Sequence, residues 1–352
     1  MDRTRYHPRD GARRGRDAPG SARTPQPAPA RGPPRPGGRG RRGGQGRAHL
    51  PVRRLGAPIG AAAPVDLARA EGRSLTEAQP VFHRVLVGTD GSARAEEAAR
   101  QGARLAVATG AELDIVHVVD TGRPHDGDVE REAEAALARA AELARSAGAE
   151  PETRLVAGDP PHALVAQAAE AGLVCVGPDA GLLGGAFRVG HVAGHVLREA
   201  PCSVLLARPD GEDFPRRILC GVDGSEASVE TATLAARLAS VTGAQLRLLH
   251  VIPVFRGGER EWTLREEEES PPELDPSVRA AASLGVGAVR EMAMGRPEHA
   301  LVAVAAREQV DLLVVGHRGV RGVARILLGS VSEHCAIHAP CSVLVVRAPR
   351  EG

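Results

Sequence analysis

An internal repeat constrains the fold of this chain more than any other feature of its sequence. Four short segments recur in the same order, so the chain is predicted to be a duplicated domain of about 130 residues per copy. The paired segments are RVLVGTDGS at Arg84–Ser92 with RILCGVDGS at Arg217–Ser225, ATGAELDIVHVV at Ala108–Val119 with VTGAQLRLLHVI at Val241–Ile252, GDPPHALVAQAAE at Gly158–Glu170 with GRPEHALVAVAAR at Gly295–Arg307, and APCSVLLAR at Ala200–Arg208 with APCSVLVVR at Ala339–Arg347.

Each copy alternates short apolar runs with helical patterns, which predicts an α/β fold with a doubly wound parallel sheet. In the second copy, prolines at 271, 272 and 276 leave room only for a short helix after Asp275. We expect two tandem domains, 81–208 and 214–348, joined by a short linker at Pro209–Pro215. In the first copy, strands are expected at Val85–Val87, Leu113–Val119, Leu155–Ala157, Leu173–Val176 and Ser203–Ala207. Helices are expected from the cap residue Ser92 to a stop at Gly110, at Glu130–Ala147, after the N-cap residue Asp159 and at Val192–Glu199.

Residues 1–80 differ from the rest in composition. They hold 17 Arg against 6 acidic residues and are rich in Pro, Gly and Ala. Such a segment buries too little apolar surface to offset the entropy of ordering, so we predict a disordered tail. A passive tail or an over-extended gene start, an arm that binds nucleic acid through its arginines, and a targeting segment all remain open.

Composition limits the compartment and the chemistry. The chain has no apolar run of 18 residues and no apolar stretch behind its first arginines, so we expect no membrane span, no secretory signal and a cytoplasmic location. Its five cysteines form no C-x-x-C pair, which favours small buried thiols in a reducing compartment. No residues have metal-ligand spacing.

A basic, glycine-rich stretch in the second copy is the strongest candidate for a ligand site. An apolar run, Leu312–Val315, ends at Gly316, and Gly319, Gly329 and Ser330 follow before the next helical pattern. Glycines let the backbone approach a ligand closely, and a helix N-terminus offers N–H groups to an anion. Ser330 can cap this helix, give its hydroxyl to a phosphate, or do both.

The spacing G-x2-G-x9-G-S, after a strand and before a helix, resembles the ATP-binding motif of the universal stress protein family, and both repeats fit that family. The resemblance implies Rossmann-like domains related to the adenine nucleotide alpha hydrolases. It also implies that Asp223 recognises adenine and ribose, that backbone at Val251 flanks the base, and that Gly295 and the glycine loop complete the site. ATP, with any Mg²⁺ arriving on its phosphates, is then the expected ligand.

The first copy departs from this motif. Aligned from its final Pro-Cys, it has Gly177, Ala180, Gly190 and His191 where the second copy has three glycines, at 316, 319 and 329, and a serine at 330. It also lacks counterparts of Val310 and Asp311. Asp90, Val118, Gly158, Gly177 and Gly190 therefore form a weaker candidate set, either a second nucleotide site or a degenerate partner domain.

Several functions remain open from sequence alone. The leading hypothesis is an ATP-binding stress-response or regulatory protein with slow hydrolysis at most, because the chain has no Walker motif and no Lys to complete one. The alternatives are an ATP-hydrolysing or nucleotidyl-transfer enzyme of the same architecture, and nucleic-acid binding through the tail. Repeated histidines at 117, 250, 162 and 299 are expected to be packing residues. The apolar last strands predict pairing between the two copies and, beyond that, a homodimer.

Overall fold

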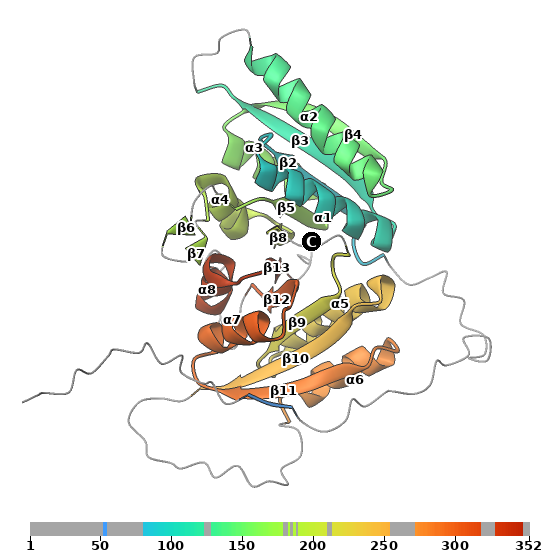
Figure 1. Ribbon diagram of the computed structural model, residues 1–352, viewed down its shortest axis with the longest axis vertical. Coiled ribbons are helices and arrows are strands. Elements are labelled where there is room, and N and C mark those ends of the chain that lie inside the picture. The colour runs from blue at the N-terminus through green and yellow to red at the C-terminus, as the bar shows by residue number, and fades with distance from the viewer. Residues whose placement is uncertain are drawn as a thin grey trace, which may run out of the picture. The chain divides into compact units, whose positions relative to one another are not determined.

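The computed structural model describes residues 52–54, 80–122, 128–178, 182–183, 186–187, 189–209, 213–253, 272–317 and 328–347. Two copies of one βα unit follow each other along the chain (Figure 1). We call residues 80–209 domain 1 and residues 213–347 domain 2.

Domain 1 alternates strands with helices. Helix α1 begins after Ser92, whose hydroxyl accepts a hydrogen bond from Ala95 N, and ends at Gly110 in the left-handed conformation, as the sequence predicts. The elements are β2 (Arg84–Thr89), α1 (Ala93–Thr109), β3 (Glu112–Asp120), α2 (Val129–Ser146), β4 (Pro151–Gly158), α3 (Pro160–Gln167) with a 3-10 turn at Ala168–Glu170, β5 (Leu173–Val176), β6 (Leu182–Leu183), β7 (Ala186–Phe187), α4 (His191–Glu199) and β8 (Ser203–Leu206).

Domain 2 repeats this order with a short second helix, as its prolines predict. Its elements are β9 (Arg217–Val222), α5 (Glu226–Thr242), β10 (Gln245–Ile252), α6 (Asp275–Ser283), β11 (Ala288–Met294), α7 (Pro297–Arg307), β12 (Leu312–Gly316), α8 (Ser330–His338) and β13 (Ser342–Val346).

Across the described residues, the main strands form one sheet of eleven, in the order β1-β11-β10-β9-β12-β13-β8-β5-β2-β3-β4. Pairing inside each domain is parallel. The domains meet where β8 pairs with β13 antiparallel, which confirms the predicted pairing of the two last strands. In each domain the strand order reverses beside its first strand, β2 or β9, and this reversal is where doubly wound sheets bind ligands.

Helices cover both faces of the sheet (Figure 1). One buried cluster lies under α1, α2, α5 and α6, and the other lies under α3, α4, α7 and α8. Ala, Val and Leu fill both clusters, in keeping with the low aromatic content. All five cysteines are free and buried, and burial raises the pKa of Cys202 to about 11 and that of Cys335 to about 12. Those two thiols stay protonated at neutral pH and act as small apolar groups.

Two equivalent arginines clamp the seam between the domains. Arg208, fully buried at the end of domain 1, donates from its guanidinium to the carbonyls of Cys341 (2.8 Å) and Ala336 in domain 2. Arg347 donates in turn to the carbonyls of Leu197 and Arg198 (both 2.7 Å). Each arginine therefore reaches the C-terminal end of the other domain's last helix, where cations are favoured.

Three strands were not expected from the sequence, and a fourth begins earlier than predicted. Strand β1 (Val52–Arg54) lies within the segment predicted to be disordered and pairs antiparallel with β11, matching Val52 to Ala293; residues 1–51 and 55–79 lie outside the described part of the chain. Strand β4 begins at Pro151, four residues before the predicted start, as an exposed edge strand. The short strands β6 and β7 form an antiparallel pair between β5 and α4.

Candidate nucleotide site

The strand registers bring the predicted residues of domain 2 to one edge of the sheet. His250 lies opposite Val222, so Asp223, which follows β9, is level with Val251 near the end of β10. Val314 lies opposite Cys220 on the other side of β9, which places Gly316 beside Val222. The carboxyl ends of β9, β10 and β12 therefore present these residues together at the reversal of strand order.

Asp223 is held by the turn that follows β9. Its Oδ1 accepts hydrogen bonds from the backbone N of Ser225 (3.0 Å) and from the Ser225 hydroxyl (2.6 Å), and the side chain is half-buried. Ser225 in turn caps α5 by accepting from Ser228 N. The carboxylate is thus fixed at the edge of the sheet by the start of the next helix.

Gly295 and the end of β10 form the second wall of the site. Gly295 has φ +136°, a conformation that favours glycine, and its N–H donates to the carbonyl of Ile252 at 3.0 Å. Buried His250 lies on the same strand, and its Nδ1 lies 3.1 Å from the carbonyl of Val222. This histidine ties β10 to β9, which agrees with the packing role predicted from the sequence.

The start of α8 differs from one sequence prediction. Gly329, not Ser330, is the N-cap residue, and Ser330 is the first helical residue, exposed to solvent. Gly329 offers no side chain to the helix N-terminus, and among the described residues the N–H groups of Ser330 and Val331 have no backbone acceptor. The helix start therefore keeps N–H groups available to an anion, and Ser330 keeps its hydroxyl.

Ser332 and His317, which the sequence analysis did not single out, help to connect β12 to α8. The hydroxyl of buried Ser332 donates to the carbonyl of Gly316 at 2.6 Å, and Gly329 N donates to the carbonyl of His317 at 3.0 Å. Ser332 is the third residue of α8, and a serine near a helix start is the signal that could have pointed to it. Gly319 lies outside the described residues, as does the rest of 318–327.

Domain 1 places its weaker set at the matching edge. Thr89 lies opposite His117, so Asp90 and Val118 are level, and Asp90 Oδ1 accepts from Ser92 N at 2.9 Å. Gly158 has φ +155° and lies opposite Asp120, and Gly190 is the N-cap of α4 with His191 first in the helix. Ala180 lies outside the described residues.

Packing alone accounts for Gly177. A Cβ built there would lie 2.8 Å from the backbone carbonyl carbon of Arg94 in α1, closer than real Cβ contacts come. Domain 1 also lacks the link to its last helix, because Ala193 stands where domain 2 has Ser332. Domain 1 thus repeats the aspartate turn and the glycine N-cap of the site, but not the serine contact between the last helix and the strand before it.

Histidines cluster beside both sites, between the last two helices of each domain. In domain 2, the His334 ring lies 4.6 Å from that of His299 and 4.2 Å from that of His338. Burial, followed by the charges of His338 and His299, lowers the pKa of His334. In domain 1, His162 lies 4.5 Å from His195 and contacts Asp159 (Nδ1 to Oδ2, 2.5 Å). Asp159 is the N-cap residue of α3, as predicted, but its side chain bonds to this ring and makes no cap hydrogen bond to the helix backbone.

The histidine on β3 has a different environment from its equivalent on β10. His117 Nδ1 is buried without a hydrogen-bond partner in the part of the chain that the structure covers, and burial lowers its pKa against the opposing effect of Asp90. No group of three or more His, Cys, Asp or Glu residues among the described ones could hold a metal ion. None of the described helices is both long enough and apolar enough for a membrane crossing.

Comparison with known proteins gives one consistent result. The profile of the Universal stress protein family matches residues 82–208 and 215–347. A universal stress protein of Mycobacterium tuberculosis is 30% identical over 299 residues, which cover 75% of this chain and 97% of that protein. One from Methanocaldococcus jannaschii is 36% identical over 149 residues, covering 40% of this chain and 88% of its own length.

Solved structures agree at the level of the fold. The crystal structure of a universal stress protein from Archaeoglobus fulgidus superposes with a TM-score of 0.60, at 20% sequence identity, over 75% of this chain and 98% of that one. The tandem arrangement of two such units thus occurs along most of both chains.

Proposed function

This chain belongs to the universal stress protein family, and on that premise we propose that it is an ATP-binding stress-response or regulatory protein whose nucleotide is held mainly by domain 2. The observation that carries the proposal is the convergence of Asp223, Gly316 and the uncapped start of α8 at the reversal of strand order. Binding sites in doubly wound sheets form at this place.

Each residue of the edge has a part in this proposal. The Asp223 carboxylate, fixed by Ser225, is positioned to accept hydrogen bonds from the base or ribose, while backbone at Val251 flanks the base. Gly295 leaves room beside the base, because it carries no side chain where β11 ends. Gly316, Gly319, Gly329 and Ser330 take the phosphates, since an α-helix start attracts anions through its N–H groups and dipole.

We propose that the protein acts by binding ATP and that partner molecules recognise its nucleotide-bound form. Occupancy would change the surface presented beside the start of α8. Mg²⁺, where present, would be ligated by phosphates and water, because that ion usually keeps several waters and few protein ligands. We expect hydrolysis to be slow at most. A homodimer is also expected, and light scattering on the purified chain tests it.

Matched aspartate variants of the full chain test the proposal. We expect Asp223→Ala to weaken ATP binding, measured by calorimetry, by about tenfold or more, because it removes charge-assisted hydrogen bonds. Asp90→Ala changes the same turn in domain 1 and is expected to leave the affinity nearly unchanged. Equal losses in both variants would contradict the assignment to domain 2. A folded protein that binds no ATP at millimolar concentration would contradict the proposal as a whole.

A further inference from the structure

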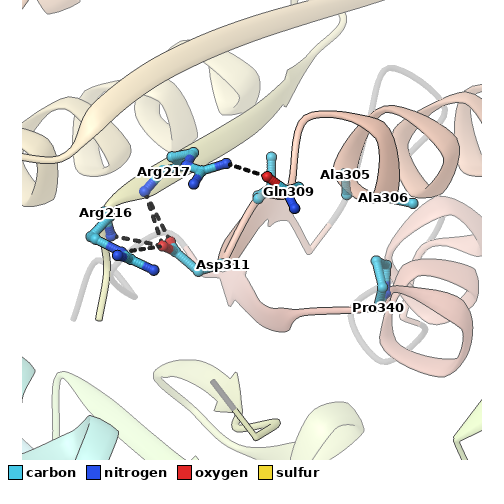
Figure 2. A pocket seen from close by; sticks show the side chains of 8 residues that line it. Arg216, Arg217, Ala305, Ala306, Gln309, Asp311 and Pro340 are labelled. Atoms are coloured by element: carbon cyan, nitrogen blue, oxygen red, sulfur yellow. Dashed lines mark hydrogen bonds and ion pairs between the residues drawn. The ribbon is translucent and has the colours of Figure 1, made fainter. Parts of the chain in front are cut away.

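The opposite edge of the domain 2 sheet contains a cavity that the nucleotide proposal does not use. Its volume is about 300 Å³, and it lies at the amino ends of β9 and β12 (Figure 2). Arg216, Arg217, Gln309 and Asp311 supply its polar wall, and Ala305 and Pro340 contribute to its apolar wall. Parallel strands place their amino and carboxyl ends at opposite edges of a sheet, so this cavity is separate from Asp223 and the start of α8.

Asp311 uses its charge to fix the start of β9. Its Oδ2 accepts from Arg216 N at 2.9 Å and its Oδ1 from Arg217 N at 3.0 Å, and the residue is only 6% exposed. Both arginines are therefore held by their backbones at the cavity wall (Figure 2). Because the carboxylate is bound to backbone N–H groups, it neutralises the positive charge of the neighbouring guanidinium groups less than a direct, close ion pair would.

The guanidinium of Arg216 is the loosely held cation of this wall. Its Nε lies 4.0 Å from Asp311 Oδ2 and its Nη1 lies 3.9 Å from Asp213 Oδ2, and 54% of the side chain is exposed. Contacts this long and this exposed contribute little. Arg217 is better fixed, because its Nη1 donates to the carbonyl of Glu308 at 3.0 Å. The cavity is therefore lined by one weakly paired guanidinium, that of Arg216, and one well-fixed guanidinium, that of Arg217, together with apolar residues.

Part of the cavity wall has no equivalent residues in the first copy. Val310 and Asp311 have no counterparts in domain 1, and the turn before them holds Gln309 at φ +51°, the left-handed region that non-glycine residues seldom adopt. In domain 1, His83 stands in place of Arg216. Its Nε2 lies 2.9 Å from the carbonyl of Glu170, and its ring packs against Gly172, where an added Cβ would lie 3.4 Å from Nδ1.

We propose that this cavity binds a small organic dicarboxylate, with Arg216 and Arg217 as its anion-binding side chains. Planar guanidinium groups match carboxylates, and the alanine and proline surface suits a short hydrocarbon body. The site also adjoins the link between the domains, since Arg216 borders a second cavity formed with Asp213, Phe214 and Pro215. A bound dicarboxylate would therefore hold Arg216, a residue close to the start of domain 2.

Titration of succinate into the full chain, at constant ionic strength and followed by nuclear magnetic resonance, tests this proposal. We expect saturable binding at one site per chain, with a shift of the Gln309 side-chain amide resonance. Arg216→Gln is expected to weaken binding about tenfold, because it removes a charge-assisted contact from an exposed position where folding is not at risk. Arg216→Lys keeps the charge and should lose less. His83→Gln, the matched change in domain 1, should have no effect.

The nucleotide site provides the second control. Gly329→Val obstructs the start of α8 and should leave succinate binding unchanged, while ATP binding is lost. Three results would overturn the proposal: no saturation at tens of millimolar succinate, equal affinity in the wild type and Arg216→Gln, or loss of succinate binding in Gly329→Val. The last would place the anion at the nucleotide edge instead, so failure of one site is distinguishable from failure of the other.

Discussion

The two domains share a frame and differ at the edge where a ligand would bind. Both cap their first helix with a serine, at Ser92 and Ser225, and both end it with a left-handed glycine. At the last helix, domain 2 has the Ser332 hydroxyl on the carbonyl of Gly316, and domain 1 has Ala193 at that position. The two copies have therefore kept the residues that begin and end the first helix, while a contact beside the candidate ligand edge differs between them.

An ion pair between neighbouring strands occurs in both domains, with its acidic and basic residues exchanged. In domain 1, Asp114 on β3 pairs with Arg154 on β4. In domain 2, the equivalent residues are Arg247 on β10 and Glu291 on β11, whose side chains lie 2.5 Å apart. Both domains therefore keep an ion pair at this position, although the charges of the two residues are exchanged. Variants at equivalent positions of the two domains can thus be compared directly.

The largest expected effect concerns the clamp at the seam. Arg208→Ala should destabilise the protein by about 4 kcal/mol, because it empties a fully buried volume and leaves carbonyls of Ala336 and Cys341 without donors. Arg347→Ala should cost about 2 kcal/mol, since that side chain is only half-buried. Urea denaturation of both variants measures the difference. Equal losses would mean that the clamp is symmetric despite its unequal burial.

The exchanged ion pair gives the next largest effect. Glu291→Gln should destabilise by about 3 kcal/mol, because it leaves Arg247 buried with less compensating charge. Arg154→Gln should cost about 0.5 kcal/mol, because 43% of that side chain is exposed and water screens the pair. Thermal and urea denaturation of each variant provide the test, and a larger loss for Arg154→Gln would contradict this account of the two edges.

The smallest expected effect is a pH dependence from the histidine stack. The folded-state pKa of His334 is lowered from 6.5, so its neutral form favours the fold; this stability is complete above pH 6.5 and is lost as the pH falls toward the folded-state pKa. His334→Asn should flatten the fall in melting temperature between pH 7 and pH 5. The flattening should be smaller for His195→Asn, whose neighbour His162 contacts Asp159. Identical profiles for both variants and the wild type would refute it.

The sequence predicted those parts of the fold that depend on local patterns. The repeat predicted two equivalent units, the apolar last strands predicted the pairing of β8 with β13, and Ser92 and Gly110 marked the two ends of α1. These features depend on residues near each other in the chain or on strands with a strong apolar pattern.

Contacts that no sequence pattern encodes, some tertiary and some local, decided the rest. Strand β1 forms because β11 has an open edge, which the composition of residues 1–80 does not reveal. The Asp159 side chain bonds to the His162 ring of the same helix rather than to a backbone N–H, and Gly329 takes the cap position predicted for Ser330. The contact between Ser332 and Gly316 joins residues sixteen apart in the chain, and no periodicity encodes it.

The central claim is that domain 2 is the principal nucleotide site, and the stoichiometry of ATP binding tests it most directly. Calorimetric titration of the full chain should give one site per chain. The Gly319→Val, Gly329→Val double variant, once shown to fold, should lose that site, and Gly190→Val in domain 1 should keep it. Two sites of equal affinity, or a site that survives the double variant, would contradict the claim.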